Sequence, residues 1–450
     1  MSIQIITQTS DICKPPVAGP REGPQGQASL GSHTAKSVPD TQNERKTARY
    51  HTQDTAQKLL PDKNEETGGP MFQVVNCARW PVPHERIELH YDGGQAFYSG
   101  LAVCGSVWVC PVCAARISGE RREELRAALR IAEHAGWGYA LATFTLRHTP
   151  ADKLTELNDA LNTAYRKTKG GRAWSAFVER WGVIGTVTAY EVTRGVNGWH
   201  PHKHVLIFFA HPLTDNELTQ VRDWLAERFC EQLARLGRYA SGIYSVDVRS
   251  TPAAVDYVTK WGLDSELTGG EAKSEHGYTP FQLLTLYDNG ATWAGAAFRE
   301  YAFATKGLVQ MRWSKGLKRA LAAALGVGSV DRDVDLLALV AEHLPVPVPE
   351  VVPEFPTWEL ELTYEWPFVV KASARGELLT VASSGDLGAV RCFLESIVDY
   401  SLDRLKAAKA RAALAAKMEE QRERRAARPI RVAGLRVWGV IGDGGEHIAA

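Results

Sequence analysis

The chain has 450 residues, and its 52 Lys and Arg balance its 52 Asp and Glu, so its formal net charge is zero. This length suffices for two or three domains, and 44% hydrophobic with 23% charged residues excludes global disorder. Attraction to nucleic acid therefore has to come from local patches. No apolar run could span a bilayer, and the first ten residues lack the pattern of a signal peptide. We expect a soluble, cytoplasmic protein.

Residues 1–70 are dominated by Pro, Gly, Ser, Thr and Gln. Apolar residues are too sparse there to offset the entropy lost on ordering. The composition therefore predicts a disordered leader.

The next segment is rich in cysteine. Cys104, Cys110 and Cys113 fall within ten residues, and the last two form a CxxC pair. In a cytosolic protein such crowding favours metal binding over disulfides. With Cys77 as fourth ligand, the four thiolates suit a closed structural Zn²⁺ site. His84 or His90 could replace Cys77, and the alternative to a metal site is a set of free buried cysteines.

The following residues alternate strand and helix patterns. A helix is expected over 117–135, a strand over 139–147, helical spacing over 152–178 with a break at Gly170-Gly171, strands over 183–193 and 201–210, a capped helix from Thr214, a strand over 243–248, and a helix over 250–261. The order β-α-β-β-α-β is that of the split βαβ, ferredoxin-like arrangement. Right-handed crossovers would put the first and third strands at the centre of an antiparallel sheet.

The third of these strands carries histidines at alternate positions. His202 and His204 point to the same face because side chains alternate along a strand. His200 joins them only if the strand stays regular through Pro201. Two imidazoles so placed can both reach one divalent cation.

A carboxylate is expected opposite these histidines. A turn centred between Val196 and Asn197 pairs Glu191 with His202, and directly paired residues have Cβ atoms about 4.5–5.5 Å apart. The set His202, His204 and Glu191 suits Mg²⁺ or Mn²⁺ held with a substrate phosphate, and also Zn²⁺. A slip of one residue would move Glu191 to the other face.

The helix that follows the last strand carries Tyr257 and Lys260 three residues apart, on one face. A tyrosine hydroxyl with a pKa near 10 is a poor nucleophile alone. A nearby ammonium and a metal-bound phosphate would favour the phenolate and take up developing charge. A packed core tyrosine is the equally good alternative.

The last quarter changes character. Proline-rich stretches over 345–356 indicate a linker, and 402–428 has helical composition. That helix has nine Lys and Arg against four acids, a net charge of +5. It is either a solvated amphipathic helix or one that contacts phosphates.

These motifs, in this order, resemble the Rep proteins of rolling-circle plasmids, within the HUH superfamily of nicking-joining enzymes, and most of all the Rep branch of actinobacteria. The resemblance covers about residues 71–320. The sequence departs from the family's pattern at Lys203, where an apolar residue is usual. Lys203 is expected to point to the sheet face opposite His202 and His204, so metal binding by these two histidines should be retained. The stretches that carry the resemblance include Leu141-Ala142-Thr143-Phe144-Thr145-Leu146, His202-Lys203-His204, Tyr257-Val258-Thr259-Lys260, the Cys104–Cys113 segment and Tyr278-Thr279-Pro280-Phe281-Gln282-Leu283-Leu284.

The resemblance implies an α+β HUH endonuclease domain that nicks single-stranded or hairpin-extruded origin DNA. Tyr257 would be the nucleophile, giving a 5′-phosphotyrosyl intermediate and a free 3′-OH primer, and Lys260 would stabilise charge. The strand is then rejoined; Asp256 and Asp264 are candidates for activating that step. Host helicase and polymerase are the further partners implied.

Four parts follow: a disordered leader (1–70), a zinc-binding subdomain with its helix (71–137), the HUH catalytic domain (138–325), and a linker with a mostly helical C-terminal region (326–450). A zinc-containing DNA-binding protein without nuclease activity is the alternative from another class. A conjugative relaxase or a single-strand transposase would share the chemistry. Candidate DNA contacts, each with a structural alternative, are Arg116, Arg121, Arg122, Arg249 and Trp199.

Overall fold

The computed structural model describes residues 42–61, 63, 71–92, 94–240, 242, 245–250, 277–328, 334–344, 357–426, 431–432 and 435–436. The described residues up to Val390 belong to one compact unit, and those from Arg391 onward to a second. Within the described ranges, no helix is both long enough and apolar enough to cross a membrane.

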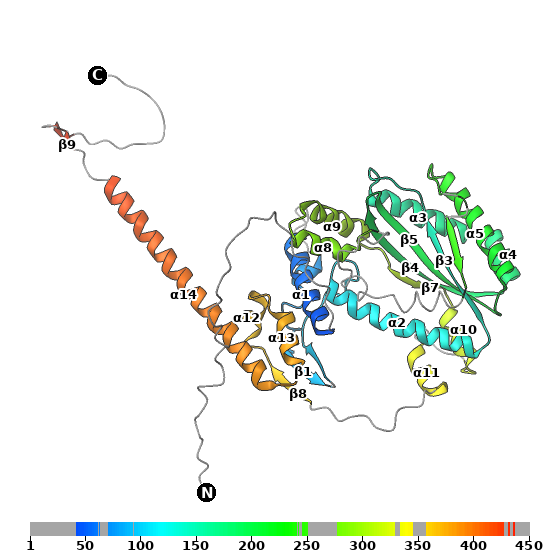
Figure 1. Cartoon of the computed structure of the whole chain (residues 1–450), viewed down its shortest axis with the longest axis horizontal. Coiled ribbons are helices and arrows are strands. Elements are labelled where there is room, and N and C mark those ends of the chain that lie inside the picture. The colour runs from blue at the N-terminus through cyan, green and yellow to red at the C-terminus, as the bar shows by residue number, and fades with distance from the viewer. Residues whose placement is uncertain are drawn as a thin grey trace, which may run out of the picture. The chain divides into compact units, whose positions relative to one another are not determined.

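The protein is a mixed α+β structure (Figure 1). The helices are α1 (Gln42–Leu59), the 3₁₀ turn η1 (Gln73–Asn76), α2 (Pro111–His134), α3 (Leu154–Thr168), α4 (Gly171–Trp181), α5 (Asp215–Ala234), α8 (Pro280–Asp288), α9 (Thr292–Thr305), α10 (Leu317–Ala324), α11 (Leu336–His343), α12 (Trp366–Lys371), α13 (Arg375–Ala382) and α14 (Leu387–Ala426). The strands are β1 (Glu88–Asp92), β2 (Gln95–Ser99), β3 (Gly138–Thr145), β4 (Val183–Gly195), β5 (Gly198–Phe209), β6 (Val246–Arg249), β7 (Met311–Trp313), β8 (Trp358–Glu361), β9 (Arg431–Val432) and β10 (Leu435–Arg436).

The main sheet has five antiparallel strands in the order β6-β3-β5-β4-β7. The two strands that the sequence places at the centre are β3 and β5, and both are flanked on each side. Their central position is therefore confirmed, and it fixes which side chains lie next to the histidines of β5.

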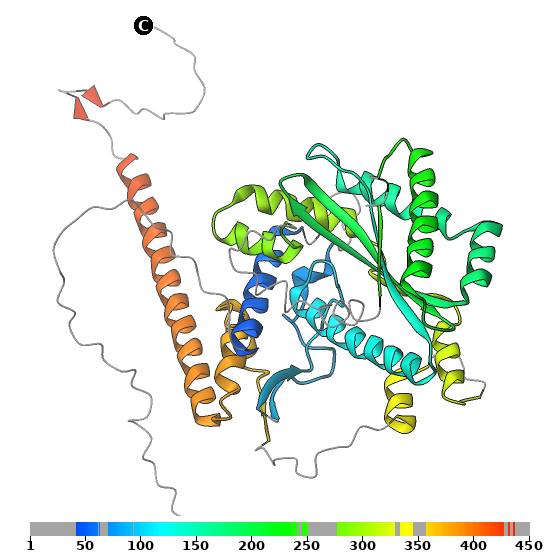
Figure 2. The same ribbon diagram turned by 45° about the vertical axis from the view of Figure 1, so that its right-hand side comes forward.

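Both faces of this sheet are covered by helices (Figure 2). On β5, Val205, Ile207 and Phe209 join the core formed with α3, α4 and α5, whereas Leu206 and Phe208 join a second core with α2, α10 and α11. A strand that is buried on both faces has apolar residues at consecutive positions, and this explains why residues 205 to 209 are all apolar. His202 and His204 share the α2 face with Leu206.

A two-residue turn joins β4 to β5. Gly195 pairs with Gly198, and Gly198 has a φ of +89°, which glycine adopts at little cost. A Cβ at Gly198 would also lie 2.7 Å from the carbonyl oxygen of Thr149. Glycine here therefore fixes the turn, and with it the register of the hairpin.

The expectation of a disordered leader is wrong for residues 42–59, which form α1. Ala56 and Leu60 join the main core, and Gln57 donates hydrogen bonds to the carbonyl oxygens of Val74 and Cys77 at 3.0 and 2.9 Å. The composition does not reveal this helix because its buried side chains are polar and find hydrogen-bond partners in the folded chain. Residues 1–41 lie outside the described residues.

The domain boundary expected at residue 326 is also wrong. The strand β8 pairs with β1 to complete a three-stranded sheet, β2-β1-β8, and α13 packs against α1 and β2. Leu336 and Val340 of α11 join the core under the main sheet. The C-terminal region up to Val390 therefore folds with the segments that precede the sheet.

Most other elements lie near their expected positions. The helix α2 begins at Pro111 rather than near Ile117, because Cys110 caps it and Pro111 occupies its first turn. Thr214 and Glu217 form the expected capping box of α5. The helix expected over 250–261 lies outside the described residues after 250, as does the linker over 345–356.

Candidate metal centres

Glu191, His202 and His204 form a compact group, here named the histidine cluster. Glu191 pairs with His202 in the register that the sequence predicts. One carboxylate oxygen, Oε2 of Glu191, lies 3.3 Å from Nε2 of His202 and 3.2 Å from Nε2 of His204. Two imidazole nitrogens and one carboxylate oxygen thus converge on a single point and could hold a metal ion.

The second nitrogen of each imidazole has a partner. Nδ1 of His202 donates to the carbonyl oxygen of His200 at 3.2 Å, and Nδ1 of His204 lies 3.0 Å from the hydroxyl of Thr143 on β3. Such bonds fix the orientation of a ligating ring and leave Nε2 for the metal. Thr143, paired with His204 across β3 and β5, is a positioning residue, and the sequence indicated it only as part of a strand motif, without this role.

The electrostatics of the cluster suit a cation. Burial lowers the pKa of His204 to about 4. Burial also acts to lower the pKa of His202, but the Glu191 carboxylate outweighs it and the pKa is raised. Burial acts to raise the pKa of Glu191, and the two imidazoles hold it well below its usual range. The carboxylate is therefore ionised and at least one imidazole is neutral, which are the states that bind metals.

His200 continues the row on the same face, because the strand stays regular through Pro201. Nδ1 of His148 donates to the carbonyl oxygen of Asn197 at 2.8 Å, and its Nε2 lies 2.9 Å from Nδ1 of His200, within hydrogen-bond distance. The rings of His200 and His202 are 5.2 Å apart. His148 follows β3 and gave no signal in the sequence, since only the fold brings it to the histidines.

Lys203 points to the opposite face, as expected, and is buried, with 7% of its surface exposed. Its ammonium lies 5.3 and 5.1 Å from the ring centroids of Tyr165 and Tyr190. Burial, with Arg312 and Lys169 nearby, lowers the pKa of Lys203 from 10.5 to about 8. Lys203 thus changes the packing beneath the strand and leaves the histidine cluster in place.

Replacing Lys203 with Met should stabilise the protein. A pKa lowered from 10.5 to about 8 corresponds to about 3 kcal/mol of unfavourable charge burial, and the absence of the tyrosine interactions offsets part of it. We expect the free energy of unfolding to rise by about 1–3 kcal/mol at pH 7. Because the folded protein releases this proton before the unfolded chain does, the gain should be full below pH 8 and vanish by about pH 10.5.

Urea unfolding of the two proteins at several pH values measures this difference. Lys167 on α3 is exposed, and Lys167→Met provides the control, with a change within about 0.5 kcal/mol. A Lys203→Met protein less stable than the parent at pH 7 would contradict the account of this site.

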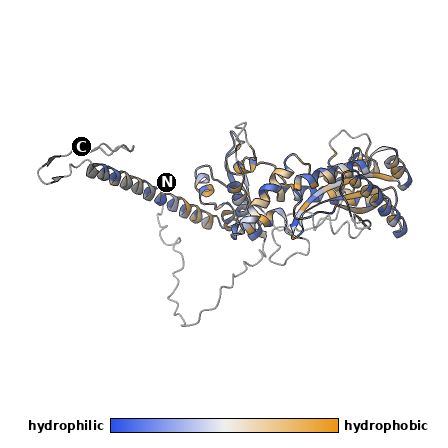
Figure 3. Ribbon diagram, turned by 90° about the horizontal axis from the view of Figure 1, so that it is seen from above, coloured by the Kyte–Doolittle hydropathy of each residue, from blue (hydrophilic) through white to orange (hydrophobic). Residues whose placement is uncertain are grey.

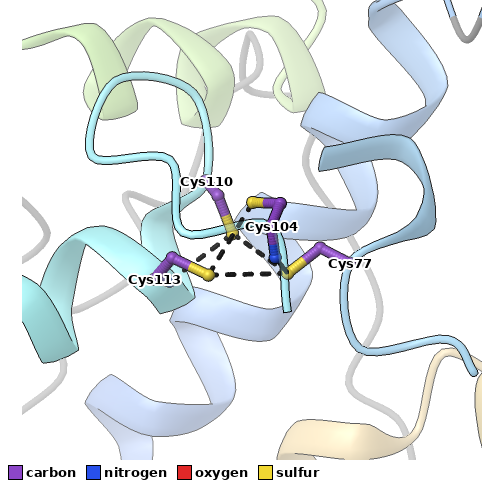
Figure 4. Close-up of side chains that lie close together, drawn as sticks. All are labelled: Cys77, Cys104, Cys110 and Cys113. Atoms are coloured by element: carbon purple, nitrogen blue, oxygen red, sulfur yellow. Dashed lines mark hydrogen bonds between the residues drawn. The ribbon is translucent and has the colours of Figure 1, made fainter. Parts of the chain in front are cut away.

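Four cysteines form the second group, here named the cysteine cluster: Cys77, Cys104, Cys110 and Cys113 (Figure 4). Sγ of Cys113 lies 3.6 Å from that of Cys77 and 3.7 Å from that of Cys104, and the Cys77–Cys110 distance is 3.7 Å. Zn–S bonds of about 2.3 Å at tetrahedral corners place sulfurs about 3.8 Å apart. The spacing fits such a site, and all four cysteines are free.

The surroundings of the sulfurs also fit a metal–thiolate centre. Four N–H groups donate to them: the backbone nitrogens of Cys104, Ser106 and Cys113, and the amide of Gln53, 3.1 Å from Sγ of Cys110. Burial raises the pKa of Cys110, and hydrogen bonds from the other three thiols lower that of Cys113. Four thiols this close cannot all ionise unless a cation joins them.

Arg375 of α13, about 300 residues after Cys77 in the chain, stabilises the loop of this cluster. It is fully buried, is paired with Asp54 of α1, and donates to the carbonyl oxygens of Cys77 and Ala78, both at 3.3 Å. One guanidinium thus ties the loop of Cys77 to α1 and α13. Nothing in the sequence pointed to this arginine.

The alternative zinc ligands lie elsewhere. His90 on β1 forms a separate group with Glu88 and Glu359, at 3.5 and 3.8 Å, and it also bonds to Ser99 at 2.7 Å. His84 is exposed. Of the three choices for the fourth ligand, the structure brings Cys77 to the other cysteines.

Several candidate residues remain to be placed. Tyr257, Lys260, Asp256 and Asp264 lie in 251–276, outside the described residues. Trp199 is 1% exposed and belongs to the core, so its core alternative is correct. Three of the candidate arginines have side-chain partners: Arg116 pairs with Glu120, Arg121 donates to Gln310, and Arg249 pairs with Asp247.

Comparison with known proteins relates this region to replication proteins. Residues 100–225 match a family described as replication protein. The matched range contains the histidine cluster and three of the four clustered cysteines; Cys77 and Tyr257 lie beyond it. The resemblance to replication proteins is thereby confirmed over this range.

Two curated relatives come from Streptomyces. The chain is 36% identical over 140 residues to the "Neomycin resistance protein" of Streptomyces cyanogenus, covering 25% of this chain and 32% of that protein. It is 36% identical over 142 residues to "Protein rep" of Streptomyces lividans, covering 25% and 31%. The alignments thus span about a third of the relatives' length. No solved structure matches the chain.

Proposed function

We propose that this protein is a replication initiator of a rolling-circle plasmid that nicks and rejoins one strand of origin DNA. The observation that carries the proposal is the convergence of Glu191, His202 and His204 on one point inside a segment similar to replication proteins. The order β6-β3-β5-β4 supports a ferredoxin-like HUH domain, because it is the order of the split βαβ arrangement.

The described residues on either side of the segment with Tyr257 pair with strands of the sheet that carries the histidine cluster. The described chain leaves β6 at Arg249, paired with Leu141, two residues from Thr143 on β3. It returns at Tyr278, whose backbone pairs with Arg194, three residues from Glu191 on β4. Both anchor points support a role for Tyr257 at the cluster.

The residues of the cluster would hold Mg²⁺ or Mn²⁺, which would polarise the scissile phosphate. The Tyr257 oxygen would attack phosphorus as the P–O3′ bond breaks, leaving a 5′-phosphate on Tyr257 and a 3′-OH that primes synthesis. Lys260 would stabilise the phenolate. Host helicase and polymerase would then act on the opened origin.

Cleavage of labelled single-stranded origin DNA tests this function. We expect a nick at one position with Mn²⁺ and none with EDTA. Absence of cleavage with every divalent ion would overturn the proposal and favour a DNA-binding protein without nuclease activity. Cleavage without any dependence of plasmid replication on the protein would favour a relaxase or a transposase.

We further propose that the cysteine cluster binds one structural Zn²⁺. Replacing Cys113 with Ser should remove the metal and destabilise the protein, because zinc–thiolate binding contributes directly to folding. Elemental analysis of the purified chain measures it: about one zinc per chain before the substitution and none after. Cys230, which bonds to Ser245 at 3.2 Å, provides the control, and Cys230→Ser should keep its zinc.

A further inference from the structure

The helix α14 contains a stretch of basic residues without acids, from 404 to 418, here named the basic segment. It has five Lys and Arg, and the nearest acids along the chain are Asp403 and Glu419. Fifteen helical residues extend over about 22 Å. The five basic residues are Arg404, Lys406, Lys409, Arg411 and Lys417.

Most of this charge is exposed to solvent. Arg404, Lys406, Lys409 and Lys417 are exposed, and Figure 3 shows hydrophilic residues along the described part of α14. Lys406 pairs with Asp403 at 3.4 Å, and both side chains are about three-quarters exposed, at 77% and 76%, so this pair is weak. Because the segment holds five cations and no acid, it carries a positive potential along the helix.

The apolar residues of the basic segment do not form the regular stripe along which two helices pack. Leu405, Leu414 and Met418 do not follow a heptad, and Met418 is 63% exposed. Seven of the fifteen residues are alanine, whose small side chains let a flat or grooved surface approach the helix closely. The pattern favours a polyanion over a second helix.

We propose that the basic segment binds the phosphate backbone of double-stranded DNA next to the origin. Lys406, Lys409 and Lys417 lie within about 80° of one another around the helix axis and span about 17 Å along it, and duplex DNA presents one phosphate per about 1.7 Å of its own axis. Sites for single strands combine a basic groove with aromatic side chains that stack on the bases, and residues 404–418 contain no aromatic side chain. The inference rests on the proposed function, and adds to it sequence-independent binding of double-stranded DNA.

Fluorescence anisotropy with a labelled 30-base-pair duplex of arbitrary sequence tests the proposal, using the full chain at 50–200 mM NaCl. Changing all five basic residues to Gln should lower the affinity at least tenfold. The slope of log K against log salt should become shallower by about 0.9 for each phosphate that the variant no longer neutralises. Mn²⁺-dependent cleavage of single-stranded origin DNA should stay unchanged.

A control variant removes the same charge elsewhere on the molecule. Its five Gln replace exposed basic residues before or within α3 and α4: Lys153, Arg166, Lys167, Arg172 and Arg180. Binding by the α14 variant equal to that of the parent, or an equal loss of affinity in the control, would overturn the proposal. If the unchanged protein binds duplex but cleaves no single strand, the proposed function fails and the duplex site stands.

Discussion

Replacing His202 with Ala should lower Mn²⁺-dependent cleavage of single-stranded origin DNA by about 10²–10⁴-fold, since several kcal/mol of charge stabilisation would be lost. Its Nε2 is one of two imidazole nitrogens that lie 3.2–3.3 Å from the same oxygen of Glu191. Glu191→Gln keeps the shape of the side chain and removes its charge, so it should have a similar effect. Both variants should bind Mn²⁺ more weakly in calorimetric titration.

The matched control is His134→Ala, because His134 is exposed at the end of α2 and lies outside the cluster. It should cleave at the parent rate. Thermal unfolding of all variants separates loss of the site from loss of the fold. Parent-like cleavage and Mn²⁺ affinity in both cluster variants would show that these residues do not hold the ion.

Replacing Arg375 with Met should cost about 3–5 kcal/mol of folding free energy. The fully buried guanidinium pairs with Asp54 and holds the carbonyl oxygens of Cys77 and Ala78, and its removal leaves a buried carboxylate without its counter-charge. Denaturant unfolding measures the change. The zinc content should fall as well, because the loop of Cys77 loses its tie to α1 and α13.

A second arginine offers a matched control. Arg86 and Glu361 also join the segment before the main sheet to β8, at 3.2 Å, but the two side chains are 73% and 48% exposed. Arg86→Met should therefore cost less than about 1 kcal/mol. If the double variant Asp54→Asn with Arg375→Met is more stable than Arg375→Met alone, the folding free energy lost in Arg375→Met comes from the unpaired carboxylate of Asp54. Equal effects of Arg375→Met and Arg86→Met would contradict the bracing role.

The local parts of the fold could be predicted from the sequence. The turn at Val196-Asn197 has two residues, so arithmetic alone pairs Glu191 with His202, and the structure has that register. The central positions of β3 and β5 follow from the handedness of crossovers. In these cases the information lies within about twenty residues, or in a general rule of topology.

Long-range packing could not be predicted. The pairing of β1 with β8 joins segments about 270 residues apart, and neither strand carries a signal for its partner. The burial of Gln53 depends on the sulfur of Cys110, and the positions of Gln57 and Arg375 depend on backbone carbonyl groups. Only the folded chain brings these partners together. The contacts of His148 and Thr143 with the histidines of β5 could not be predicted for the same reason, since these neighbours come from different strands.

The covalent intermediate offers the most direct test of the central claim. The full chain is incubated with Mn²⁺ and single-stranded origin DNA, and the protein–DNA adduct is digested and mapped by mass spectrometry. The account predicts a phosphotyrosyl bond at Tyr257, lost in Tyr257→Phe and absent in EDTA. An adduct on another residue, or one that Tyr257→Phe still forms, would contradict it.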